Sequence, residues 1–97
     1  MQFEWDETKN QTNIRKHGLD FTDAWEIFTH PMLIGLDDRE EYDENRWIGI
    51  GLLKTRIVVV VYVEREQETI RIISLRKALA YEREKYEQAL TNGLGAR

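Results

Sequence analysis

The sequence predicts an α+β fold in which two N-terminal helices and a C-terminal helix flank one antiparallel β-sheet. Three observations support this class. Four strand patterns with short connections follow one another between residues 32 and 74, helical patterns lie at both ends of the chain, and a β-branched run fills residues 57–61. With a short strand at the N-terminus, the predicted order is β-α-α-β-β-β-β-α. The length of 97 residues fits a single domain, residues 1–97.

The N-terminal segment predicts a short strand followed by an unusually polar helix. Phe3 and Trp5 alternate with polar residues, as in a strand. Asp6 can cap a helix that runs to about His17, and Gly18 can end it in the left-handed conformation. The best stripe at helical spacing contains one hydrophobe among four residues: Asn10, Asn13, Ile14 and His17. Such a helix either packs weakly or presents polar groups to something other than the core.

The second predicted helix has conventional signals. Asp20 can cap it, and Pro31 stops it. Its predicted buried face holds the residues at i, i+3, i+4 and i+7, which are Phe21, Ala24, Trp25 and Phe28. Fully burying one such aromatic side chain contributes roughly 1.5–3 kcal/mol, so we expect much of the core's stability here.

The four central strands are predicted at residues 32–36, 46–53, 57–63 and 70–74. The third of them has no polar alternation, which is typical of a strand covered on both faces. In the second, Gly49 and Gly51 share one face with Trp47 and leave a shallow trough. We expect a helix rather than a ligand to fill that trough.

The last helix is predicted to begin near Ser74, as N-cap, and to end near Thr91. Glu82 interrupts its apolar stripe at a position where a hydrophobe is due. A carboxylate on a packing face needs a cation, so we predict a structural ion pair between Glu82 and either Arg71 or Arg76.

The charge of the chain is unevenly distributed. The net charge of −4 comes from 18 acidic and 14 basic residues. Six of the acids and only Arg39 among the bases fall within eight positions: Asp37, Asp38, Glu40, Glu41, Asp43 and Glu44. The rest of the chain carries twelve acids and thirteen bases, so composition permits a surface that binds polyanions without predicting one.

Several classes of protein are not supported by the sequence. There is no cysteine, no apolar run typical of a signal peptide and no stretch long enough to span a bilayer, so we expect a cytoplasmic protein. The two histidines lie in different predicted elements, and the acidic segment lacks the glycine of a calcium-binding loop. Motifs that bind nucleotides are absent, so we expect neither a metal nor a cofactor.

The cations around the last hairpin need an explanation. Arg65 ends one strand, Arg71 lies inside the next, and Arg76 follows it. Arginine is costly to hold beside a sheet without an anionic partner. That partner is either one of the chain's own carboxylates or the phosphate of a ligand.

A set of motifs links these residues to a known family. In order along the chain they are Trp5-Asp6 with Lys9 and Asn13, Lys16-His17-Gly18, Arg71-Ile72-Ile73-Ser74 with Arg76 and Ala78, and Glu82 with Tyr86. Together they resemble the BrnT toxins, ribonucleases of bacterial type II toxin–antitoxin systems with a RelE-like fold, over Phe3 to Glu87. The chain departs from the family at Leu75, where a small residue is usual, and at Glu66, where a glycine is frequent.

The resemblance implies a toxin that cleaves RNA and stops translation. It also implies a BrnA-type antitoxin that neutralises the toxin and whose DNA-binding part represses the shared operon. We therefore expect a heterotetramer of two toxins and two antitoxins, with no direct DNA binding by this chain alone.

Metal-independent RNA cleavage needs a base, an acid and cations that stabilise charge on the phosphate. An imidazole with a reference pKa of ~6.5 can serve as base or acid near neutrality. The predicted catalytic residues are His17, Arg46, Arg65 and Arg71. The predicted substrate-binding residues are Lys9, Lys16, Trp47, Ser74 and Arg76.

Less specific interpretations of the same residues stay open. His17 also suits the negative end of a helix dipole, Lys9 and Lys16 also suit a solvated helix face, and Trp47 also suits the core. For the protein as a whole, the alternatives are a non-catalytic module whose basic face docks an acidic partner segment, and a degenerate toxin that has lost activity.

Overall fold

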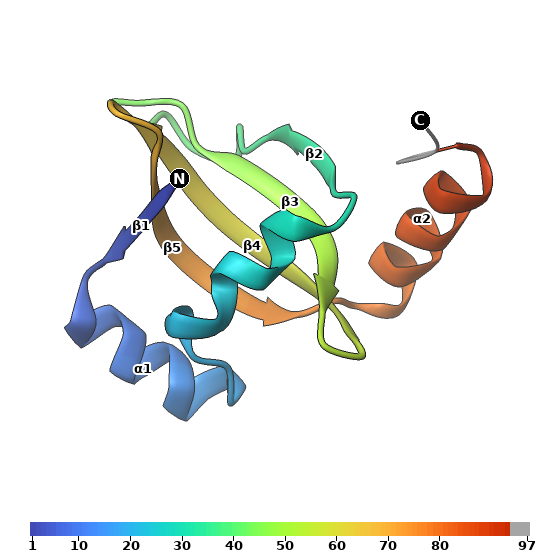
Figure 1. Ribbon diagram of the computed structural model, residues 1–97, viewed down its shortest axis with the longest axis horizontal. Helices are drawn as coiled ribbons and strands as arrows, with labels where there is room; N and C mark the ends of the chain where they lie inside the picture. The colour runs from blue at the N-terminus through green and yellow to red at the C-terminus, as the bar shows by residue number, and fades with distance from the viewer. Residues whose placement is uncertain (94–97) are drawn as a thin grey trace.

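The computed structural model describes residues 1–93 and shows a five-stranded sheet with helical elements packed on both faces (Figure 1). The elements in chain order are β1 (Gln2–Trp5), α1 (Glu7–His17), η1 (Phe21–Thr29), β2 (Leu33–Leu36), β3 (Trp47–Leu53), β4 (Arg56–Arg65), β5 (Thr69–Lys77) and α2 (Ala80–Thr91). Within these residues, no helix is both long and apolar enough to cross a membrane.

The sheet is mixed, with strand order β1-β5-β4-β3-β2. The four strands β2 to β5 pair antiparallel, as predicted from their short connections. β1 instead pairs parallel with β5, with Phe3 opposite Ile70, so the prediction of a purely antiparallel sheet was wrong. A local pattern predicts that a strand exists but not its direction, and the partner of β1 is the last strand of the sheet, which is distant in sequence.

The second helical element, η1, is a 3₁₀-helix rather than the α-helix that the sequence predicted. Its buried residues are Phe21, Ala24 and Ile27, which are spaced by three because this helix has three residues per turn. Trp25, predicted to be buried, is therefore 53% exposed. Phe28 is partly buried, and its ring lies 5.0 Å from the Tyr62 ring of β4.

The polar stripe of α1 is part of the protein's interior. Asp6 caps the helix through the backbone N–H of Lys9, and Gly18 ends it at φ 70°, both as predicted. Asn13 is buried: its Nδ2 donates to the carbonyl oxygens of Leu19 and Leu75 at 3.0 and 2.9 Å, and its Oδ1 accepts from Leu75 N at 3.2 Å. α1 is thereby fixed to β5 by hydrogen bonds that satisfy buried backbone groups, rather than by apolar packing.

Two apolar clusters lie on opposite faces of the sheet. The larger joins η1 to the face of β4 that carries Val58, Val60 and Tyr62, and the smaller joins Tyr86 of α2 to the face that carries Val59. Burial of β4 on both faces was predicted, and the structure confirms it. The trough at Gly49 and Gly51 is filled by Met32, which lies between η1 and β2, and at Gly51 also by Ile27 of η1. The expected helical occupant is therefore confirmed at Gly51 but not at Gly49.

The C-terminal helix α2 begins later than predicted. Ser74, the predicted N-cap, is a strand residue that pairs with Val61, and β5 continues to Lys77 opposite Val58. The long buried strand β4 needs a backbone partner along its length, and this outweighs the capping preference of serine. The N-cap is Leu79, whose N–H donates to Glu82 Oε1 at 2.8 Å.

Candidate functional site

A β-bulge in β5 brings two of the predicted arginines to the same face of the sheet. Arg71 and Arg76 are five positions apart, so in a regular strand their side chains point to opposite faces. The pairing between β4 and β5 shifts by one residue, from Val61 opposite Ser74 to Tyr62 opposite Ile72, which leaves Ile73 unpaired. The extra residue restores the alternation, so Arg71, Ser74 and Arg76 all point to the face on which α2 packs.

The other two arginines share that face. Arg65 lies two positions beyond Val63, which pairs with Arg71. Arg46 lies two positions before Ile48, which pairs with Val61. Because side chains alternate along strands, all of them project to the same side. We call the set Arg46, Arg65, Arg71, Ser74 and Arg76 the arginine face.

Two of these arginines form exposed ion pairs. Arg71 Nη1 lies 2.7 Å from Glu4 Oε2, and Arg65 Nη1 lies 2.9 Å from Glu44 Oε2. The four side chains are 30–45% exposed. Ion pairs of this kind contribute little stability, typically about 0–1 kcal/mol, so a phosphate can compete with the carboxylates for these guanidinium groups.

Arg76 is held in a stronger pair. Its Nη1 and Nη2 donate to Glu82 Oε1 and Oε2 at 2.8 and 2.9 Å, and the Glu82 side chain is only 8% exposed. The guanidinium holds the pKa of the Glu82 carboxyl below its ordinary value. Of the two partners predicted for Glu82, the structure selects Arg76, and the pair links β5 to the first turn of α2.

Arg46 differs from the others, because within residues 1–93 it has no carboxylate partner. Its guanidinium lies 4.2 Å from the centroid of the Tyr42 ring, a cation–π contact. Its Nε is buried and lacks a hydrogen-bond acceptor among the described residues. A buried donor without a partner is rare in proteins and is typical of a place that a ligand or water completes.

His17 lies beside the arginine face, at the end of α1. It lines a hollow of about 280 Å³ between α1 and β5, together with Thr8, Lys9, Thr12, Asn13, Lys16, Ile73 and Ser74. Burial, and then the charges of Lys16 and Arg76, lower the pKa of His17 below its ordinary value of 6.5. The imidazole is therefore mainly neutral at pH 7 and can accept a proton. The hollow brings together four of the predicted residues: Lys9, Lys16, His17 and Ser74.

Trp47 does not join this group. It lies one position from Arg46 and therefore points to the opposite face, where it is half-buried against the larger cluster. The structure thus brings eight of the nine predicted site residues to one side of the sheet or its rim, and Trp47 to the other.

Sequence reasoning missed three contributors to the site. Tyr42 stacks on Arg46, Glu4 pairs with Arg71, and the bulge at Ile73 aligns the arginines. The only available signal was the alternation of Glu4 with Phe3 and Trp5, which places its side chain on the face opposite theirs. Nothing in the sequence shows which strand lies next to it.

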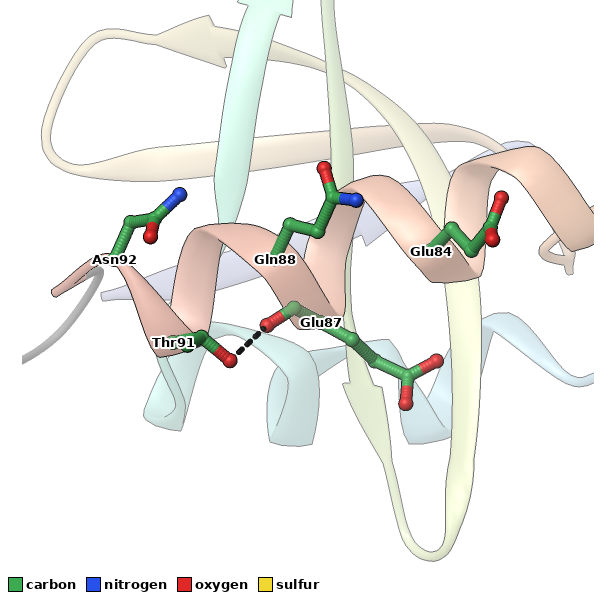
Figure 2. Close-up of a pocket in the computed structure, with 5 residues that line it drawn as sticks. All are labelled: Glu84, Glu87, Gln88, Thr91 and Asn92. Atoms are coloured by element: carbon green, nitrogen blue, oxygen red, sulfur yellow. Dashed lines mark hydrogen bonds between the residues drawn. The ribbon is translucent and has the colours of Figure 1, made fainter.

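One other hollow is chemically unsuited to a phosphate. Figure 2 shows one on the outer side of α2, lined by Glu84, Glu87, Gln88, Thr91 and Asn92, where Thr91 donates to the Glu87 carbonyl at 3.0 Å. It contains two carboxylates and no cation. Within residues 1–93, no group of three or more His, Asp or Glu side chains is arranged to hold a metal ion.

Comparisons with known proteins agree with the sequence motifs. The model of a family described as "Ribonuclease toxin, BrnT, of type II toxin-antitoxin system" matches residues 5–82. The crystal structure of the Brucella abortus ribonuclease toxin BrnT superposes with a TM-score of 0.66 at 34% sequence identity, covering 81% of this chain and 97% of that one. No curated protein matches the chain. The family match over most of the chain and the similarity of the solved structure show that this protein belongs to the BrnT family of ribonuclease toxins of type II toxin–antitoxin systems.

Proposed function

We propose that this chain cleaves RNA at the arginine face without a metal ion, by attack of a ribose 2′-hydroxyl on the adjacent phosphate. The observation that carries the proposal is the convergence of Arg46, Arg65 and Arg71 on one face, next to the hollow that holds His17. Guanidinium groups bind phosphate oxygens in pairs and stabilise the charge that develops on them.

Each residue has a role in this reaction. His17, mainly neutral, accepts the proton of the 2′-hydroxyl as the 2′-oxygen–phosphorus bond forms and the bond to the 5′-oxygen breaks. The leaving 5′-oxygen takes up a proton from a water molecule, and His17 returns its proton to the solvent. Arg46, which has an unpartnered Nε, is the main phosphate ligand, and Arg65 and Arg71 exchange their carboxylates for phosphate oxygens.

The remaining predicted residues have supporting roles. Lys9, Lys16 and Ser74 line the hollow and bind a neighbouring phosphate of the same strand. Arg76 is engaged with Glu82 and acts on His17 through its charge. Base stacking by Trp47, on the opposite face, stays a prediction.

In the cell, such an activity stops translation, and a BrnA-type antitoxin neutralises it. We propose an assembly of two toxins and two antitoxins in the cytoplasm, in which this chain makes no direct contact with DNA. The RelE-like classification of the fold is part of the same proposal.

One observation favours a different function. Arg65, Arg71 and Arg76 all have carboxylate partners within the chain, as expected of a structural ion-pair network on a non-catalytic binding module. Arg46 and His17 support the catalytic function, because neither has a carboxylate partner in the part of the chain that the structure describes.

The test is RNA cleavage by purified protein in EDTA. We expect the wild type to produce fragments that end in a 2′,3′-cyclic phosphate. Arg46→Ala should lower kcat/KM roughly 100-fold, the typical effect of removing one group that stabilises transition-state charge. Arg56→Ala is the matched control, because Arg56 is an exposed arginine at the distant turn between β3 and β4.

Induction of the same variants in cells gives a second measurement. The wild type and Arg56→Ala should arrest growth, whereas Arg46→Ala and His17→Ala should not. Cleavage that requires added Mg²⁺, or full toxicity of both site variants, would contradict the proposed mechanism. Tight antitoxin binding without any RNA cleavage would instead support the non-catalytic module.

A further inference from the structure

The strand β2 forms an open and apolar edge of the sheet. It ends the strand order, and its exposed residues Ile34 and Leu36 are each 51% accessible to solvent. Native sheets usually protect an open edge with charged residues or proline, and β2 (Leu33–Leu36) contains neither. The opposite edge strand, β1, exposes the polar residues Gln2 and Glu4 instead.

The backbone of β2 is also open at the same residues. Asp37 N, just after the strand, donates to Arg46 O at 2.7 Å, so Asp37 directs its N–H toward the β3 side. Alternate residues of an antiparallel ladder direct both backbone groups to the same neighbour, so Leu33 and Gly35 also face β3. Ile34 and Leu36 therefore direct N–H and C=O outward, where an added strand can bind them.

Two hollows lie along this edge and differ in character. The first, of about 270 Å³, lies between the strands and α2 and is mainly apolar, lined by Leu33, Ile34, Gly35, Ile48, Ile50, Tyr81, Glu82 and Lys85. The second, of about 290 Å³, continues from Leu36 into the loop between β2 and β3 (residues 37–46), which we call the acidic loop. It is lined by Leu36, Asp37, Asp38, Glu40, Glu41, Tyr42, Glu44, Asn45 and Arg46. The edge thus leads from an apolar half to an acidic half.

We propose that β2 binds an extended segment of the antitoxin, which adds a strand to the sheet. This inference rests on the proposed function, because it names the surface through which neutralisation occurs. The segment has apolar residues that face the first hollow and basic residues at the end that meets the acidic loop. RNA does not fit this edge, because the carboxylates of the loop repel phosphates.

The location of the edge explains how a partner bound there stops cleavage. The acidic loop carries Tyr42, which stacks on Arg46, and Glu44, which pairs with Arg65. A segment held along β2 and this loop therefore lies next to the arginine face and obstructs the approach of RNA.

Two variants of the full-length toxin test the edge, with the purified BrnA-type antitoxin as the binding partner in calorimetry. Ile34→Asp places a charge on the apolar half, and Leu36→Pro removes an outward N–H while sparing the hydrogen bonds to β3. We expect each variant to bind the antitoxin roughly tenfold more weakly or worse. RNA cleavage by the free variants should be unchanged, but the antitoxin should no longer suppress it. Trp25→Asp, which alters a 53% exposed hydrophobe on η1, should bind the antitoxin like the wild type.

Circular dichroism checks that the variants fold. If Leu36→Pro does not fold, Ile34→Asp alone tests the inference. If the wild type cleaves RNA and binds the antitoxin, but Ile34→Asp binds it equally well, the edge is not the docking surface although the proposed function stands. If the wild type neither cleaves RNA nor binds the antitoxin, both proposals fail. A toxin dimer that Ile34→Asp dissociates, with unchanged antitoxin affinity, would assign the edge to self-association and overturn the inference.

Discussion

At the scale of single residues, the proposed chemistry depends on the environment of His17. The side chain is half-buried, and Lys16 and Arg76 lie close enough for their charges to lower its pKa. Both effects favour the neutral imidazole, since burial and neighbouring cations disfavour a third positive charge. A histidine that serves only as a favourable charge at a helix end has its pKa raised instead. The environment therefore favours the role of a base.

The pH dependence of cleavage tests this role. If His17 accepts the proton of the 2′-hydroxyl, kcat/KM should fall with acid below a pKa that lies under 6.5 and should level off above it. The activity rises with pH because the reaction needs the unprotonated imidazole of His17, and this form dominates above the pKa. Activity should be measured from pH 4.5 to 8.

His17→Asn keeps a polar side chain but cannot titrate, so its residual activity should show no acidic limb. A limb that persists in this variant would assign the titration to another group. A limb centred above pH 6.5 would contradict the electrostatic environment described here.

Residue types were predictable from the sequence, but their partners were not. The arginines, His17 and the need of Glu82 for a cation follow from composition and spacing. The pairing of Arg71 with Glu4 joins residues at opposite ends of the chain, and the stacking of Arg46 on Tyr42 depends on the path of an irregular loop. Both contacts are set by tertiary structure, which local sequence patterns do not predict.

At the scale of secondary-structure elements, the sequence predicted which elements exist but not their detailed geometry. The order of elements, the caps of α1 and the burial of β4 are as expected. The 3₁₀ geometry of η1 was not predictable, because Phe21, Ala24 and Phe28 fit a period of 3.6 as well as Phe21, Ala24 and Ile27 fit a period of three. The bulge at Ile73 has no local signature either, although it aligns Arg71 with Arg76.

The attachment of α2 to the sheet depends on Glu82. Glu82→Ala removes two charged hydrogen bonds to Arg76 and the one from Leu79 N, so we expect a loss of roughly 1.5–3 kcal/mol in the free energy of unfolding. Urea denaturation at pH 7 measures this loss in the free energy of unfolding. Glu84→Ala is the matched control, because Glu84 is an exposed carboxylate on the same helix (Figure 2).

The difference in stability between the wild type and Glu82→Ala should also depend on pH. The folded-state pKa of Glu82 is lowered, so the ionised carboxylate stabilises the fold fully above its unfolded value. That contribution is lost as the pH falls through the folded-state pKa. An equal difference at pH 7 and at pH 3 would show that the ion pair does not contribute.

At the scale of the whole molecule, the positively charged arginine face lies on a protein whose net charge is negative, −4. Four acids of the loop, Asp38, Glu40, Glu41 and Asp43, are exposed. In the structure they make no side-chain ion pair or hydrogen bond within residues 1–93. Their field opposes the approach of RNA over distances comparable to the Debye length, about 10 Å at 0.1 M salt.

Neutralising these four residues as Asn or Gln should therefore strengthen RNA binding several-fold at 50 mM salt. Fluorescence anisotropy with a short single-stranded RNA measures the change. The advantage should vanish near 0.5 M salt, where charges are screened over a few ångströms. An advantage that does not depend on salt would show a change of conformation rather than of long-range charge.

Membership of the BrnT family was the most predictable property of the whole molecule. The motifs that carry it run from Trp5 to Tyr86, and they are informative together although each is weak alone. The direction of β1 and the shared face of the arginines lay beyond these motifs, because both depend on how distant segments meet in three dimensions.

The parallel pairing of β1 with β5 has a consequence for how the protein is made. β1 leaves the ribosome before the other four strands, but its partner strand spans Thr69–Lys77, so β1 has no strand partner until β5 has been synthesised (Figure 1). Glu4, His17 and the arginines of β4 and β5 are assembled only after that delay. The proposed RNA-binding surface of this toxin therefore forms only after β5 has been synthesised, so a nascent chain that lacks β5 also lacks this surface.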